Sequence, residues 1–197
     1  MIIYGGNNCF DTQFSDVWIL SHADGTGGTP AWTELTPAGS GPSPREQQNA
    51  IYDSVNNIMT IFGGWAQTAD LNDVWTLSHA NGQGGAPAWT MLSPSGAPPV
   101  PRQASSVGYD PTHNVMIISG GSDATALLTD TWVLSNANGL GGTPVWTQLH
   151  TGSTPAEQRS QQTAVYNPGT NIMTVYGGTV SGLYLSDVYK LSKANGQ

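Results

Sequence analysis

Apolar and polar positions alternate over short stretches of this chain, and no stretch has the three-to-four-residue periodicity of a helix. Four such segments follow one another in the second quarter of the chain: 49–53 (NAIYD), 57–62 (NIMTIF), 73–77 (DVWTL) and 88–92 (AWTML). Turn-forming residues separate them, with DSVNN after the first and Asn81-Gly82 before the last. The pattern predicts four short antiparallel strands, which we name a, b, c and d in chain order.

This four-strand pattern recurs along the chain at intervals of 57 or 58 residues. The recurring markers are a Gly-Gly pair (5–6, 63–64, 120–121, 177–178), an aspartate (16, 73, 130, 187), a tryptophan (32, 89, 146), an arginine (45, 102, 159) and a tyrosine (52, 109, 166). We expect a single domain over 1–197 with about 3.5 repeats, at approximately 3–60, 61–117, 118–174 and 175–197.

A twisted sheet of four strands has two apolar faces, so each repeat must stack against its neighbours. That is the architecture of a β-propeller blade. In such a blade the b–c and d–a connections lie at one end, which we call the b–c/d–a face, and the a–b and c–d connections lie at the other. The repeats begin at strand b and end after strand c, so we expect a partial propeller. We favour self-association or further blades of a longer chain over a closed four-bladed monomer.

The repeat resembles the kelch family. The residues that carry the resemblance are IFGG (61–64), DVW (73–75), Trp89 and PVPR (99–102), and equivalents of this pattern run through the entire chain. The resemblance implies four-stranded propeller blades, in rings that usually have six or seven of them. The chain is too short for such a ring.

Some kelch propellers are enzymes of sugar chemistry, and the resemblance raises that activity as an alternative. The copper site of the galactose oxidases has no counterpart here, because Cys9 is not accompanied by a histidine pair. The sialic-acid mutarotases use a glutamate and an arginine near the channel. Glu46 beside Arg45, and Glu157 near Arg159, are the pairs that could correspond to them.

The b–c loops differ strongly between repeats, whereas the c–d loops are nearly copies of one another. Function concentrates in variable loops on a rigid scaffold, although neutral drift in exposed loops would leave the same pattern. The aromatic residues of the b–c loops are the ligand candidates, because exposed aromatic rings suit sugars and protein partners: Phe10, Phe14, Trp65 and Tyr184.

Arg45, Arg102 and Arg159 are all the arginines of the chain, and each precedes strand a of a repeat. They are candidates for an arc of guanidinium groups on the b–c/d–a face that binds an anionic ligand. The alternative is structural, with each arginine bound to backbone or to a repeat aspartate.

Composition narrows the range of partners. The chain has 5 Lys+Arg against 13 Asp+Glu and a net charge of −8, so it lacks the basic footprint of a nucleic-acid-binding protein. No apolar run is long enough to span a membrane. The histidines have no ligand spacing, and we expect no metal or other cofactor. Low charge and one cysteine favour an extracellular or cell-surface protein of bacterial type, although the chain carries no signal peptide.

These observations favour a non-catalytic recognition or assembly module that binds a protein or a carbohydrate through the b–c/d–a face. The alternatives are a part of a sugar-active enzyme, oxidase-like or mutarotase-like, and a structural or filament subunit. An enzyme needs convergent titratable groups. Beyond the arginines, the face offers few of them: Glu46, Asp70, Asp123 and Glu157.

Overall fold

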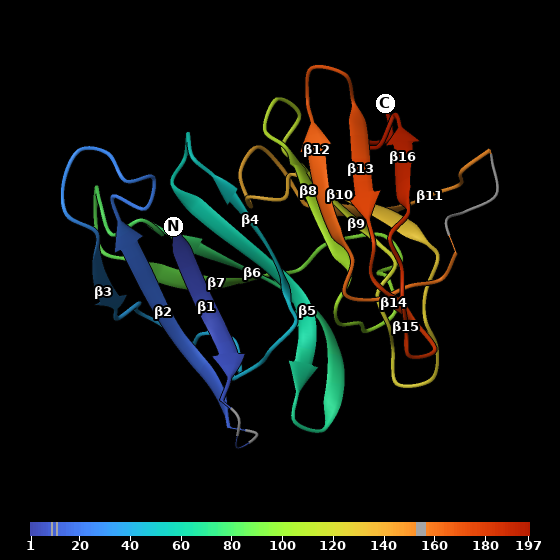
Figure 1. Ribbon diagram of the computed structural model, residues 1–197. Coiled ribbons are helices and arrows are strands. Elements are labelled where there is room, and N and C mark those ends of the chain that lie inside the picture. The colour runs from blue at the N-terminus through green and yellow to red at the C-terminus, as the bar shows by residue number, and fades with distance from the viewer. Residues whose placement is uncertain (9, 11, 153–156) are drawn as a thin grey trace.

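The computed structural model describes residues 1–8, 10, 12–152 and 157–197. Within them the chain forms sixteen strands and no helix. Four antiparallel sheets of three or four strands follow one another in chain order, from β1–β3 to the sheet that ends with β16 (Figure 1). All-β architecture and stacked propeller blades, as predicted from the repeat, are confirmed.

We number the sheets as blades 1 to 4. Blade 1 contains β1 (Ile2–Asn7), β2 (Gln13–Ser21) and β3 (Ala31–Leu35). Blade 2 contains β4 (Asn49–Asp53), β5 (Ile58–Ala66), β6 (Ala69–Ser78) and β7 (Ala88–Leu92). Blade 3 contains β8 (Ser106–Asp110), β9 (Val115–Ser119), β10 (Thr131–Ser135) and β11 (Val145–Leu149). Blade 4 contains β12 (Thr163–Asn167), β13 (Ile172–Tyr176) and β16 (Val188–Ser192), and the hairpin β14 (Thr179–Val180) with β15 (Leu183–Tyr184) lies between its last two strands.

Blades 2 and 3 have the full strand order a-b-c-d, blade 1 has b-c-d, and blade 4 has a-b-c. The expected repeat boundaries at 60, 117 and 174 fall inside β5, β9 and β13. The sequence period defines the length of a repeat but not its phase, so each boundary cuts through strand b and separates strand a from the rest of its sheet.

Burial along the b strands follows the position of each blade in the stack. In blade 2, β5 is buried at every position from Ile58 to Gly64, because one blade packs on each of its faces. In blade 4, β13 is buried only at alternate positions, because only one of its faces meets another blade. The equivalent run in blade 4, 171–176 (NIMTVY), is as apolar as 57–62 (NIMTIF), so the difference in burial comes from the position of the blade and not from the sequence.

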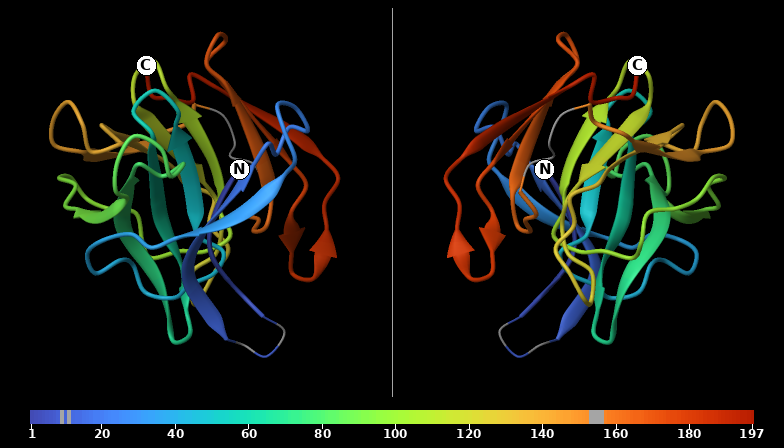
Figure 2. Two further views of the ribbon diagram at one scale, coloured as in Figure 1. Left: turned by 90° about the vertical axis from the view of Figure 1, so that its left-hand side faces the viewer. Right: turned by 90° about the vertical axis from the view of Figure 1, so that its right-hand side faces the viewer.

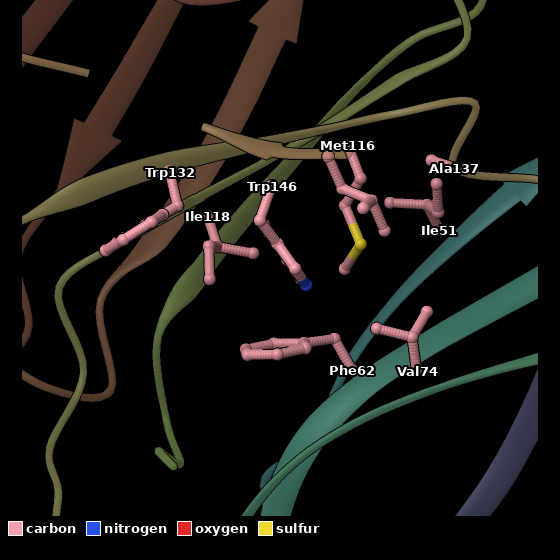
Figure 3. Packing of buried hydrophobic residues seen from close by; sticks show 9 residues of the cluster. Ile51, Phe62, Val74, Met116, Ile118, Trp132, Ala137 and Trp146 are labelled. Atoms are coloured by element: carbon pink, nitrogen blue, oxygen red, sulfur yellow. The ribbon is translucent and has the colours of Figure 1, made fainter. Parts of the chain in front are cut away.

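The core lies between blades rather than inside any one of them. Between blades 2 and 3 the cluster contains side chains from both sheets (Figure 3): Ile51, Phe62, Val74, Met116, Ile118, Trp132, Leu134, Ala137 and Trp146. Phe62 meets Trp146 edge-on, with ring centroids 5.0 Å apart and planes at 62°. The recurring tryptophan of strand d thus packs against the preceding blade, and Trp89 makes the same contact with Tyr4 between blades 1 and 2.

The Gly-Gly pair does not end strand b of blade 2, contrary to the sequence-based expectation. The ladder between β5 and β6 shifts register between Phe62 and Gly64 and continues to Ala66, paired with Ala69. Gly63 and Gly64 have φ of +64° and +97°, and a Cβ on Gly64 would lie 2.7 Å from the Glu46 carbonyl oxygen. The pair therefore forms a bulge that redirects the strand, and the b–c connection of this blade is a projecting hairpin.

The near-identical c–d loops have a structural role at the opposite end of the blades. Asn138, in the c–d loop of blade 3, donates through Nδ2 to Asp53 Oδ2 of blade 2 at 2.7 Å, and Asn195 does the same to Asp110 of blade 3. Burial alone would raise the pKa of Asp53, but hydrogen bonds from Asn56, Asn138 and backbone amides lower it overall. These bonds join consecutive blades, which explains why the loop asparagine recurs.

Candidate functional site

The b–c connections of blades 1, 2 and 4 lie at one end of the molecule. The ends of β1 and β5 and the hairpin β14–β15 all point toward the bottom in Figures 1 and 2, away from the a–b turns such as the one between β12 and β13. The d–a segments join them there, since the Gly64 amide donates to the Arg102 carbonyl and the Arg102 amide donates to the Leu71 carbonyl. The two kinds of connection thus form one surface, the b–c/d–a face.

The three arginines are buried beneath this face. Each is only 1–2% exposed, and each guanidinium forms a two-pronged ion pair with an aspartate 28 residues later in the chain. In blade 3, Arg102 donates from Nη1 and Nη2 to the two carboxylate oxygens of Asp130 at 2.6 and 2.8 Å. Its Nη1 also donates to the Gly120 carbonyl, and its Nε donates to the Val100 carbonyl.

Each arginine therefore links two blades. The backbone of Arg102 bonds to blade 2, through Gly64 and Leu71, while its side chain bonds to blade 3. Burial tends to raise the pKa of Asp130, but hydrogen bonds from Arg102 and Trp132 and the charge of Arg102 outweigh it and lower the pKa. Of the two roles open to the arginines in the sequence, the geometry is that of the structural one.

The four aromatic candidates are spread over three blades. Phe10 and Phe14 lie on blade 1, Trp65 lies at the tip of β5, and Tyr184 lies on β15 of blade 4. Phe10, Phe14 and Tyr184 are exposed, whereas Trp65 is half-buried. Tyr184 lines a hollow of about 290 Å³ beside Gly177 and Gly178, so the four rings do not meet in one pocket.

Trp65 is held in place by neighbouring backbone. The Trp65 amide donates to the Glu46 carbonyl at 2.8 Å, and the Glu46 amide donates to the Trp65 carbonyl at 3.0 Å. Gln13 Nε2 from blade 1 also donates to the Trp65 carbonyl and to Glu46 Oε1, at 3.0 and 3.3 Å. The tip of the β5–β6 hairpin is thereby attached to blade 1.

A cavity of about 470 Å³ opens beside Trp65, between the hairpin of blade 2 and the b–c loop of blade 3. Its wall consists of one aromatic ring, two carboxyl groups and a largely apolar d–a segment: Trp65, Thr68, Ala69, Asp70, Val100, Pro101, Asp123, Ala124 and Thr125. We call it the Asp70 cavity. In the sequence, Asp70 and Asp123 are recognisable only as titratable groups of the face. The sequence does not predict that they line one cavity, because that depends on how blades 2 and 3 are placed.

The two carboxyl groups of this cavity have opposite environments. Burial, and then the charge of Asp123, raise the pKa of Asp70 above its ordinary value. Hydrogen bonds from the backbone and side chain of Thr125 and from the Ala126 amide lower the pKa of Asp123. Asp123 therefore ionises more readily than an ordinary aspartate, and Asp70 ionises less readily.

The glutamate–arginine pairs suggested by the mutarotase resemblance do not form an acid–base site. Arg45 and Arg159 are bound to Asp73 and Asp187. Glu46 accepts from Gln13, and the Glu157 carbonyl, not its carboxylate, accepts from Arg159. Within residues 1–8, 10, 12–152 and 157–197, no three His, Cys, Asp or Glu side chains group closely enough to hold a metal. Cys9 lies outside the described residues.

Comparison with known proteins places the chain in a family. The KLHDC2/KLHL20/DRC7 Kelch-repeats domain matches residues 1–139, and the chain belongs to the kelch-repeat proteins. Adagio-like protein 1 of Oryza sativa subsp. japonica is 30% identical over 97% of this chain and 29% of its own length. Acyl-CoA-binding domain-containing protein 5 of Arabidopsis thaliana is 25% identical over 99% of this chain and 28% of its own length.

The chain spans less than a third of the length of these relatives. They are plant proteins, so the comparisons give no support to the bacterial origin that composition suggested. Kelch repeats generally mediate protein–protein interaction. The described part of the chain contains no apolar helix long enough to cross a bilayer.

Proposed function

We propose that this chain is a recognition module that binds a protein partner through its b–c/d–a face. The observation that carries the proposal is the contrast between the two ends of the blades. The c–d loops repeat because they hold Asp53 and Asp110, whereas the b–c connections differ in each blade and present Phe10, Trp65 and Tyr184. The b–c connections vary between blades while the rest of each blade repeats, so this surface can suit one particular partner without a change in the scaffold.

Three substitutions on the face test this proposal: Phe10→Ser, Trp65→Ser and Tyr184→Ser combined in one variant. The matched control carries Val55→Ser and Leu140→Ser, which remove exposed apolar side chains at the opposite end of the blades. We expect proteins that co-purify with the wild-type chain to be lost with the face variant and retained with the control. Equal retention by both variants would contradict the proposal. A glycan array run on the same proteins tests carbohydrate as the ligand class.

A second candidate function, assembly with a further blade, rests on residues that lie at equivalent repeat positions. Phe62 in blade 2 is fully buried, whereas Tyr176, its equivalent two repeats later, is 51% exposed on the outer face of blade 4. Val165 and Val188, the equivalents of buried core residues in blade 2, are exposed on the same face. We propose that another blade, from a second copy or from a longer chain, covers it.

Light scattering on a size-exclusion column tests the assembly candidate. We expect a mass above the 20.6 kDa of one chain, and we expect Tyr176→Glu to return the mass to that value. The matched control is Tyr184→Glu, which places the same charge on an exposed tyrosine of the b–c/d–a face. A mass of one chain at all concentrations would count against self-association.

A further inference from the structure

The Asp70 carboxylate lies on the b–c/d–a face without any hydrogen-bond partner among the described residues. Both of its oxygens are almost completely shielded from solvent. A carboxylate shielded in this way is costly unless a donor or a positive charge meets it. Asp70 lines the cavity between blades 2 and 3, so a positively charged group that enters there would lie close to the Asp70 carboxyl group and offset its charge.

We propose that the Asp70 cavity binds a cationic side chain, lysine or arginine, of the protein partner. The inference rests on the proposed function and specifies one contact of that surface. Its volume of about 470 Å³ lies within the usual range of binding pockets. Trp65 offers an aromatic face for a cation, Val100 and Pro101 offer apolar surface for the methylene groups of the side chain, and two carboxylates balance its charge.

Neither Asp70 nor Asp123 belongs to the repeated scaffold. The residues 57 positions before and after Asp70 are Gln13 and Leu127, and those around Asp123 are Ala66 and Val180. The aspartates that bind the buried arginines, in contrast, recur in every repeat. The repeated scaffold therefore does not require carboxylates at this cavity, and a role in ligand binding would account for them.

The charges around the cavity select a cation over an anion. Arg102 is buried and both of its terminal nitrogens donate to Asp130, so its guanidinium group is not accessible to an incoming carboxylate. Glu46, whose backbone is hydrogen-bonded to that of Trp65, adds a further negative charge near the hairpin. An anionic ligand would meet carboxylates and no available counter-charge.

An organic cation fits the cavity better than a metal ion does. Asp123 Oδ1 already accepts three hydrogen bonds, from the amides of Thr125 and Ala126 and from the Thr125 hydroxyl, each at 2.8 Å. The Asp70 oxygens have no partner in the described part of the chain but are shielded from solvent, so they are not exposed ligands, whereas a calcium ion requires six or more oxygen ligands. A guanidinium or ammonium group brings its own donors and needs only one acceptor and an apolar surround.

The experiment is a titration of the whole chain with the peptide acetyl-Gly-Gly-Arg-Gly-Gly-amide, followed by ¹H–¹⁵N chemical shifts. The citrulline peptide, which has nearly the same shape and no charge, is the ligand control. Asp70→Asn is the test variant. Asp24→Asn is the matched control, because Asp24 is an exposed carboxylate in a c–d loop at the other end of blade 1.

We expect the arginine peptide to shift the Trp65 indole and the amides of 68–70, and the citrulline peptide to leave them unchanged. Asp70→Asn should weaken the binding of the arginine peptide by about tenfold, the effect of removing one charged partner, and Asp24→Asn should leave the affinity unchanged. Equal binding by both peptides, an unchanged affinity of Asp70→Asn, or shifts at 68–70 produced by calcium chloride but not by the arginine peptide would overturn the inference.

The result of this titration and the result of the partner-binding test can be told apart. If the face variant loses its protein partner while the arginine peptide fails to bind, the surface is a recognition site without a cation pocket. If the face variant keeps its partner, the proposed function fails whatever the peptide does. Asp70→Asn removes charge without removing volume, so a native amide spectrum is expected and is recorded before each titration.

Discussion

Replacing Arg102 by alanine tests how the blades are held together. The substitution removes the two-pronged ion pair with Asp130 and also the hydrogen bonds to the Gly120 and Val100 carbonyls. It leaves Asp130 without its counter-charge between blades 2 and 3. We therefore expect Arg102→Ala to lower the stability of the fold and not to remove a contact with a ligand.

The magnitude follows from the burial of the two partners. Breaking a buried ion pair by removing one partner costs about 3–5 kcal/mol. The Asp130 side chain is 22% exposed and still accepts from Trp132 Nε1, so water can partly replace the arginine. We therefore expect a loss near the lower limit, about 3 kcal/mol of unfolding free energy. For Arg159→Ala we expect about 1 kcal/mol, because Asp187 is 37% exposed on the terminal blade.

Urea unfolding followed by tryptophan fluorescence measures both losses. With a typical slope, a loss of 3 kcal/mol lowers the urea midpoint by about 1–2 M. Adding Asp130→Asn to Arg102→Ala should recover part of the loss, because the double variant no longer leaves a charge without a partner. A midpoint of Arg102→Ala equal to that of the wild type, or equal losses for Arg102 and Arg159, would refute the reasoning.

Three further outcomes follow from the same structure. Asn138→Ala should lower the unfolding free energy by about 1–3 kcal/mol, because it leaves Asp53 without a buried donor between blades, and urea unfolding measures it. The folded-state pKa of Asp130 is lowered from 3.8, so its ion pair stabilises above that value and the stabilisation disappears as pH falls below it. The difference in urea midpoint between wild type and Arg102→Ala should therefore narrow below about pH 4, and an unchanged difference would contradict this. Asp70→Asn should raise the urea midpoint at pH 7, because the folded-state pKa of Asp70 is raised and its ionised form therefore destabilises the fold.

The strictness of the 57-residue period made the blades predictable from the sequence. Apolar runs such as 57–62 and the strand DVW at 73–75 located the strands, because the two faces of each interior blade are buried. The extension of β5 and β6 past Gly63 was not predictable in the same way. Half of the residues of WAQTADLN (65–72) are polar, and the pairing of this segment depends on a bulge that the sequence pattern does not record.

The links between blades were only partly predictable. The recurrence of arginine and aspartate suggested a pair but not which copies meet, because the partner 28 residues ahead is defined only once the blades are stacked. The recurrence of asparagine in the c–d loops was a visible signal whose partner, 85 residues away for Asn138 and Asp53, could not be inferred from spacing. The Asp70 cavity has no periodic signal, since Asp70 and Asp123 meet only through the placement of two variable loops.

Site-specific photocrosslinking tests the central claim most directly. The photoreactive residue p-benzoylphenylalanine is placed at Phe10 or Tyr184 on the b–c/d–a face, and at Val55 or Leu140 at the opposite end of the blades; all four positions are exposed. A recognition module of the proposed kind forms crosslinks to the same partner protein from the first two positions and not from the last two. Crosslinks to a partner from Val55 or Leu140 alone, with none from the b–c/d–a face, would contradict the account.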